Sequence, residues 1–256
     1  MPNSKASVSS TYMEDTKSKY LQNPLPPVSR KALVVGYSED NIGGEISRRL
    51  EADGLEVYSA EEEELPASSL SSFKRLPEYD TIIFNNGRTH LDWIEKQDER
   101  QIDEVVYNSL TSSMTGTADF VGATKDKPYQ KNIVYIGSMA YRNVLNGSAP
   151  YCAAKAGLAM FARCMAWELA PKNYNVFCVH PSNTEHAPMS AETVRGLMRY
   201  RSLNREDAEA YWGASLPRSA WLQKQDIASV VSYLVSGDSG ASYLSGSNIE
   251  LGGGQR

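Results

Sequence analysis

The sequence has few cysteines, no long hydrophobic run and no cluster of basic residues. Its three cysteines, Cys152, Cys164 and Cys178, have no metal-type spacing, and a small, odd number fits a reducing compartment better than a disulfide scaffold. No apolar stretch approaches the ~18 residues of a transmembrane helix, and the N-terminus lacks the basic-then-apolar order of a signal peptide. We therefore expect a cytoplasmic protein without a membrane span.

Lysine and arginine are too dispersed to indicate a nucleic-acid binder. The net charge is −5, and affinity for phosphates depends mainly on clustered basic side chains. The acidic run 61–64 is the only charge block, and its simplest interpretation is a solvated strand end or helix start. With 256 residues, 41% of them hydrophobic, the chain can form one large domain with a sizeable core.

Apolar runs and helical patterns alternate from about residue 30 onward. The pattern predicts strands at 32–35, 55–59, 80–84, 132–137, 175–179 and 247–251, and helices at 43–53, 99–124, 151–170 and 225–236. This alternation indicates an α/β fold over residues 28–256: a doubly wound parallel sheet covered by helices on both faces, in three layers α/β/α. Residues 1–27 are interpreted as a flexible arm, and the polar-aromatic stretch 186–224 as a substrate lid.

Residues 138–155 hold the strongest indication of chemistry. Tyr151 and Lys155 are four positions apart on a predicted helix, so both side chains project from one face. A lysine ammonium close to a phenol favours the phenolate and brings it into range for acid–base work near neutral pH. Ser138 ends the preceding strand, where open α/β sheets meet their ligands, and could hold a substrate oxygen beside the phenol. The Tyr-x-x-x-Lys spacing alone also arises by chance on amphipathic helices.

The segment GYSEDNIGGEI, residues 36–46, lies between a predicted strand and a predicted helix. A dinucleotide phosphate binds at such a turn, although the glycines here depart from the G-x-G-x-x-G spacing. Asn is the best non-glycine substitute at a positive φ angle, so Asn41 could keep the turn. Backbone N–H groups at the helix start, rather than the glycines themselves, attract the pyrophosphate. The residues expected to line the cofactor here are Gly36, Tyr37, Ser38, Asn41 and Ile42.

Together, several segments resemble the short-chain dehydrogenase/reductase family over nearly all of residues 30–254. SAPYCAAKAGL corresponds to the family's Tyr-x-x-x-Lys helix, VYIGSMA to its strand-ending Ser, EVVYNSLTS to its helix Asn, and DTIIFNNGRT to its Asn-Asn-Ala-Gly segment. The resemblance implies a Rossmann-type fold, a homodimer or homotetramer, and hydride transfer between a nicotinamide cofactor and a carbonyl or alcohol carbon of a small organic substrate. The catalytic set that it implies is Asn108, Ser138, Tyr151 and Lys155.

The resemblance also implies a role for each of these residues. Tyr151 would be the acid–base group, and Lys155 would lower its pKa and bind the nicotinamide ribose. Ser138 would steady the substrate oxygen, and Asn108 would place a water in the proton relay. A carboxylate at the cofactor ribose accepts from a free 2′-hydroxyl and repels a 2′-phosphate, so NAD is favoured over NADP. Further cofactor contacts implied in this way are Glu61 at that ribose, Asn85, Asn86 and Gly87 after the third strand, and Pro181, Ser182 and Thr184 near the carboxamide.

Several segments depart from the family pattern. Ser182 replaces a Gly, His186 or Thr184 stands where the family has Thr, and the stretch 65–73 offers no acid to meet the adenine. Two alternatives stay open: a cofactor-sensing or scaffold protein on this fold, and a non-redox enzyme such as a halohydrin dehalogenase. The complete catalytic set argues against the first, and Lys155, where dehalogenases carry Arg, argues against the second. His180 and His186 are interpreted as structural residues, or His186 as a contact for an anionic substrate group.

Overall fold

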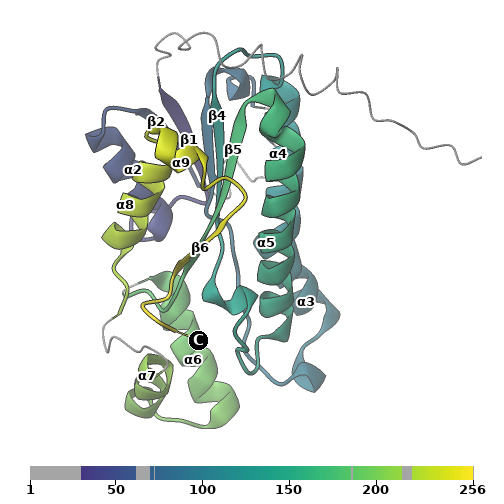
Figure 1. Cartoon of the computed structure of the whole chain (residues 1–256). Helices are drawn as coiled ribbons and strands as arrows, with labels where there is room; N and C mark the ends of the chain where they lie inside the picture. Colours follow the sequence, from purple (N-terminus) through teal and green to yellow (C-terminus); the bar gives the residue numbers. More distant parts are fainter. Residues whose placement is uncertain (1–29, 62–69, 72, 186, 215–220, 256) are drawn as a thin grey trace, which may run out of the picture.

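A single six-stranded parallel sheet forms the centre of the protein (Figure 1). The computed structural model describes residues 30–61, 70–71, 73–185, 187–214 and 221–255, so the expected arm at 1–27 lies outside the described residues. The sheet order is β2-β1-β3-β4-β5-β6, and every neighbouring pair is parallel. The strands are β1 (Lys31–Val35), β2 (Glu56–Ala60), β3 (Thr81–Phe84), β4 (Lys131–Ile136), β5 (Tyr174–Pro181) and β6 (Asn248–Leu251).

Helices cover both faces of this sheet, which confirms the predicted α/β fold class. One layer contains α2 (Ile42–Ala52) and α8 (Lys224–Leu234), and the other contains α4 (Ser112–Thr124) and α5 (Ala149–Leu169) (Figure 1). Successive strand side chains point to opposite faces. Leu33 therefore packs in the core beneath α4 and α5, whereas Val34 packs in the core beneath α2 and α8.

Several other helical elements are short or interrupted. The single helix predicted at 99–124 consists of α3 (Glu99–Val106), a π-helical turn η4 (Tyr107–Thr111), and α4. The short elements are η2 (Leu76–Glu78), η3 (Ile94–Lys96), η5 (Met139–Tyr141), η6 (Ala170–Lys172) and α9 (Ser239–Ser242). None of the helices in the described part of the chain is long and apolar enough to cross a membrane.

The chain reverses its direction across the sheet between β1 and β3. Strand β2 lies on one side of β1, and β3 lies on the other. Ligands of open α/β sheets bind at such a switch point, outside the carboxyl ends of the strands. The helices α6 (Pro188–Arg201) and α7 (Arg205–Gly213), which come from the stretch expected to form a lid, lie beyond this end of the sheet (Figure 1).

Candidate active site

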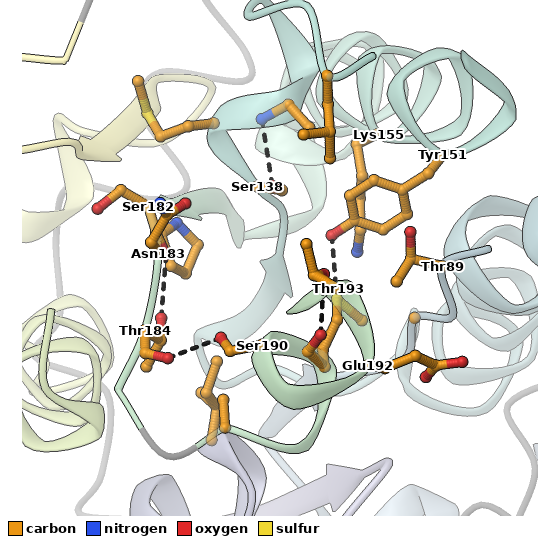
Figure 2. Close-up of a pocket in the computed structure, with 18 of the residues that line it drawn as sticks. Thr89, Ser138, Tyr151, Lys155, Ser182, Asn183, Thr184, Ser190, Glu192 and Thr193 are labelled. Atoms are coloured by element: carbon orange, nitrogen blue, oxygen red, sulfur yellow. Dashed lines mark hydrogen bonds between the residues drawn. The ribbon is translucent and has the colours of Figure 1, made fainter. Parts of the chain in front are cut away.

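A cavity of about 570 Å³ lies at the carboxyl ends of the strands, against α6 and α7. Figure 2 shows Ser138, Tyr151 and Lys155 on one side of it and the segment 182–184 on another. The cavity therefore joins the ends of β4 and β5 with the N-terminal part of α5. Its lining includes fourteen of the residues expected from the sequence: Gly36, Tyr37, Ser38, Asn41, Ile42, Asn85, Asn86, Gly87, Ser138, Tyr151, Lys155, Pro181, Ser182 and Thr184.

Lys155 is the buried cation of this cavity. Its side chain is 2% exposed, and its Nζ donates to the carbonyl oxygens of Asn86 at 3.2 Å and Ile136 at 2.9 Å. Burial disfavours the charged form and lowers the pKa of Lys155 to about 8. A Cβ added to Gly87 would lie 3.3 Å from this Nζ, so the absence of a side chain at Gly87 leaves space above the ammonium.

Tyr151 lies one helical turn before Lys155 on α5, as the spacing predicted. Its hydroxyl donates to the Sδ atom of Met189 at 3.5 Å, and a hydrogen bond with the Ser138 side chain lowers its pKa. Burial has the larger effect and raises the pKa of Tyr151 to about 12. The lowering of the Tyr151 pKa expected from Lys155 is absent from its causes, and the Lys155 ammonium donates instead to two carbonyls.

Ser138 follows β4 and begins the short helix η5. Its Oγ accepts from the N–H of Ala140 at 3.1 Å, which orients the hydroxyl at the start of η5. The extended backbone of Ser138, with φ −169°, continues the direction of the strand before the chain turns. The strand end thus places Ser138 where its side chain meets the Tyr151 hydroxyl.

The loop after β1 is closed by amide side chains rather than by an Asn at positive φ. Asn41 has φ −94° and is the N-cap of α2, so its expected role at a positive φ angle is wrong. Its Oδ1 accepts from the N–H of Gly44 at 3.0 Å, and its Nδ2 donates to the carbonyl of Gly36 at 2.9 Å. Gly36 itself has φ 82°, and a Cβ there would lie 3.0 Å from the Asn85 carbonyl carbon. Asn41 therefore closes a six-residue turn by hydrogen bonds.

The groups around this loop fit a dinucleotide. Asn86 is 3% exposed and lines the cavity, and neither its Oδ1 nor its Nδ2 has a hydrogen-bond partner among the described residues. A buried amide without partners is costly, so a bound molecule is the simplest source of those hydrogen bonds. The first-turn N–H groups of Ile42 and Gly43 have no acceptor within the helix and favour an anion such as a pyrophosphate.

Two of the expected site residues lie outside the described lining of the cavity. Asn108 is on the π-helical turn, and its Nδ2 donates to the Glu104 carbonyl at 2.8 Å. Glu61 follows β2 directly and is exposed. The loop after β1 comes close to Glu61, because Tyr37 N–H donates to the Ala60 carbonyl at 3.0 Å. Of the other expectations, His186 and the stretch 65–69 lie outside the described residues.

Ser109, which the sequence reasoning missed, is the buried polar residue of the π-helical turn. It is 0% exposed, and its Oγ both accepts from the N–H of Arg88 at 3.2 Å and donates to the Arg88 carbonyl at 3.0 Å. Ser109 thus fixes the segment after β3 that carries Asn86 and Gly87. Helical spacing was the available signal, since Ser109 lies four positions after the buried Val105.

Residues from the stretch expected to form a lid, and from the turn before Tyr151, line the other side of the cavity. Helix α6 contributes Met189, and the turn after η5 contributes Asn143 and Val144. Among the described residues, no group of His, Cys, Asp or Glu could hold a metal ion. The further lining residues on this side are Leu145, Asn146, Ala187, Pro188, Ser190, Glu192, Thr193, Leu197, Tyr200, Tyr211, Trp212 and Gln255.

Known proteins resemble this chain over most of its length. The family described as enoyl-(acyl carrier protein) reductase matches residues 44–256. Nodulation protein G of Rhizobium sp. (strain N33) is 28% identical over 251 residues, which cover 88% of this chain and 96% of that protein. The 3-oxoacyl-(acyl-carrier-protein) reductase of Pseudomonas aeruginosa is 28% identical over 230 residues, which cover 87% of each chain.

Solved structures show the same fold. An actinorhodin polyketide ketoreductase with NADPH has a TM-score of 0.78 at 23% identity, and the match covers 89% of this chain and 97% of that chain. A 3-ketoacyl-(acyl-carrier-protein) reductase from Brucella melitensis with NADH has a TM-score of 0.76 at 17% identity, and the match covers 89% and 98% of the two chains. At these identities the likeness shows the fold alone.

Proposed function

The chain belongs to the short-chain dehydrogenase/reductase family and is an NAD(P)-dependent oxidoreductase, and we propose that it interconverts a carbonyl group and a secondary alcohol on a small organic substrate. The observation that supports this proposal is the meeting of Ser138, Tyr151 and Lys155 at one cavity. A scaffold or cofactor sensor has no need of a buried phenol that is hydrogen-bonded to a serine hydroxyl and has a buried ammonium 5.8 Å from its ring centroid.

Tyr151 is the proton donor in the proposed reduction. When bound, the nicotinamide supplies the hydride, and the oxygen of the accepting carbonyl gains negative charge. The pKa of Tyr151, raised by burial to about 12, keeps its hydroxyl protonated at neutral pH, so the phenol can donate to that oxygen. Ser138 hydrogen-bonds the same oxygen from the end of β4 and holds it in line with the phenol.

Lys155 connects this proton donor with the cofactor. An ammonium has three N–H donors, and two of them reach the Asn86 and Ile136 carbonyls. The third is free to bind a ribose hydroxyl of the nicotinamide half. After the Tyr151 proton has left, the same positive charge stabilises the phenolate.

The substitution Tyr151→Phe tests this proposal. It removes the hydroxyl and keeps the ring, so kcat for carbonyl reduction should fall by roughly 100-fold or more. The dissociation constant for the cofactor, measured by fluorescence titration, should stay near the wild-type value. Carbonyl reduction at a near wild-type rate in this variant would sink the proposal, and so would a wild-type protein that reduces no member of a broad ketone panel with NADH or NADPH.

The finer assignments belong to the same proposal. Glu61 favours NAD over NADP, although the similar structures described above contain NADPH in one case and NADH in the other. The contacts of α6 with the cavity support its role as a substrate lid. A cytoplasmic location and a homodimer or homotetramer remain predictions from the sequence and the family resemblance.

A further inference from the structure

His180 connects the end of β4 with the last strand of the sheet. The ring is 0% exposed, and its Nδ1 lies 3.3 Å from the Ser138 nitrogen and 3.1 Å from the Ser138 carbonyl oxygen. On the other side of the ring, Nε2 lies 3.2 Å from the Oδ1 of Asn248 on β6. This close approach requires Gly137, because a Cβ there would lie 2.5 Å from the His180 Nδ1.

Nδ1 of this ring faces both polar groups of the Ser138 backbone. With the proton on Nε2, Nδ1 accepts the N–H of Ser138, and with the proton on Nδ1 it donates to the Ser138 carbonyl, so either tautomer bonds this backbone. Burial lowers the pKa of His180, and the positive charge of Lys155 acts in the same direction. Because its pKa is lowered, the wild-type ring is neutral over a wider pH range than an exposed histidine and bonds the Ser138 backbone in that form.

Two further residues of the turn after Ser138 are fastened to the C-terminal segment. The ring of Tyr141 packs on His180 with centroids 4.0 Å apart, and its hydroxyl donates to the Glu250 carboxylate on β6. Arg142 pairs with the same carboxylate at 2.7 Å and donates to the carbonyl of Gln255 at 3.2 Å. Three residues within a five-residue stretch, Ser138, Tyr141 and Arg142, are therefore tied to β6 and the tail.

We propose that His180, Tyr141 and Glu250 form a positioning network that fixes the Ser138 turn against β6, so that Ser138 meets the substrate oxygen beside Tyr151. This inference rests on the proposed reaction. None of the three side chains needs to touch the substrate in this role. Small displacements of a positioned group reduce catalysis strongly, so a contact from the last strand can control the rate.

The substitution Asn248→Asp tests the network through its pH dependence. It preserves side-chain size and places a carboxylate at Nε2, which raises the His180 pKa. The carboxylate can only accept, so the neutral ring of this variant carries its proton on Nε2 and accepts the Ser138 N–H at Nδ1, whereas the doubly protonated ring can only donate to the Ser138 carbonyl. This exchange of partners shifts the Ser138 turn, so kcat should fall below wild type, by up to about 100-fold, at pH values where the ring is charged. It should recover as the pH rises through the raised His180 pKa. The charged or titratable groups facing the ring, which both proteins share, are Tyr141, Lys155, Cys178 and Glu250.

A second variant, Tyr141→Phe, keeps the ring on His180 and removes the bond to Glu250. We expect kcat to fall by roughly tenfold while the KM for the cofactor stays unchanged. Tyr129→Phe is the matched control, because it also removes one phenol hydrogen bond, to the Pro77 carbonyl at 3.1 Å, and Tyr129 is not part of the cavity lining. It should leave kcat at the wild-type value.

The outcomes separate this inference from the proposed function. A wild-type pH profile in Asn248→Asp, or a wild-type kcat in Tyr141→Phe, while Tyr151→Phe is inactive, would overturn the network and leave the reaction standing. If Asn248→Asp fails to fold, kcat of Tyr141→Phe alone decides. An active Tyr151→Phe variant would overturn both proposals.

Discussion

At the scale of single residues, Lys155 shows how function and stability conflict. Its ammonium is buried against two carbonyls, and burial lowers its pKa to about 8, whereas a lysine in an unfolded chain has a pKa near 10.4. The unfolded chain therefore binds a proton more readily than the folded protein between these values. Stability must decrease as the pH falls from about 10 to 8, because the folded state disfavours the charged form.

Replacing this charge should stabilise the protein while it removes activity. We expect Lys155→Met to lose carbonyl reduction, since the apolar side chain cannot stabilise a phenolate at Tyr151. At each pH, the quantity of interest is the free energy of unfolding of the variant minus that of wild type. This difference should be larger at pH 8 than at pH 10 by roughly 1–3 kcal/mol. Urea unfolding at the two pH values measures this difference. A pH-independent difference would contradict a lowered pKa of Lys155.

The proposed preference for NAD depends on one residue. Glu61 is exposed at the end of β2, and the bond from Tyr37 N–H to the Ala60 carbonyl brings the loop after β1 close to it. A carboxylate there repels a 2′-phosphate. We expect Glu61→Gln to reduce the preference for NADH over NADPH by roughly three- to tenfold, measured as the ratio of the two dissociation constants. Glu56→Gln, at the other end of β2, should leave that ratio unchanged.

Sequence reasoning identified the types of residue at the site better than their conformations. The Tyr-x-x-x-Lys spacing correctly placed Tyr151 and Lys155 on one helix face, because helical periodicity is local. The conformation of Asn41 depends instead on Gly36 and Gly44, which it bonds only once the turn has formed. The pKa of Tyr151 depends on burial, which no local pattern encodes.

At the scale of elements, helix α6 brings a flexible apolar side chain to the reacting atoms. The sulfur of Met189 accepts from the Tyr151 hydroxyl at 3.5 Å, and its methyl group lies 3.4 Å from a Cβ built on Gly87. Met189 therefore occupies space that a carbonyl substrate must enter. The sequence predicted a lid near the strand ends, but it did not single out Met189 as a residue that faces the cavity.

Shortening this side chain should widen the range of substrates. We expect Met189→Ala to raise kcat/KM for bulky ketones relative to small ones by roughly tenfold, since a pocket discriminates by 1–3 kcal/mol per methylene. The measurement is the ratio of kcat/KM for a matched pair of ketones. Met198→Ala, on the same helix but packed away from the cavity, should lower thermal stability and leave this ratio unchanged. An equal change of the ratio in both variants would show that α6 acts only through its stability.

At the scale of the whole molecule, the layered arrangement of strands and helices could be predicted from the sequence. The hydrogen bonds that join distant segments at the site could not. Each strand and helix has its own periodicity, so the alternation of elements is readable, and a parallel sheet follows from it. The bonds that complete the site join distant segments. Ser109 with Arg88 is one example, and Tyr141 with Glu250, 109 positions apart, is another. Such pairs depend on how the layers pack.

The outer face of α5 gives the last prediction. Trp167 is 88% exposed and Met160 is 56% exposed, and they are seven positions apart, so they lie on one side of the helix. An association surface on this helix would cover both side chains. We expect the protein to form at least a dimer through this face, as the family resemblance implies.

The substitution Trp167→Glu should therefore yield a monomer. A charge on this face would be buried against the partner without a counter-charge, and a residue near a two-fold axis also meets its own copy, so both effects oppose association. Light scattering after size exclusion should show the mass of one chain for this variant and at least twice that mass for wild type. Tyr243→Glu introduces the same charge at a side chain that is equally exposed, at 89%, but not on α5, and should retain at least the dimer. A wild-type mass in Trp167→Glu would rule out α5 as the interface.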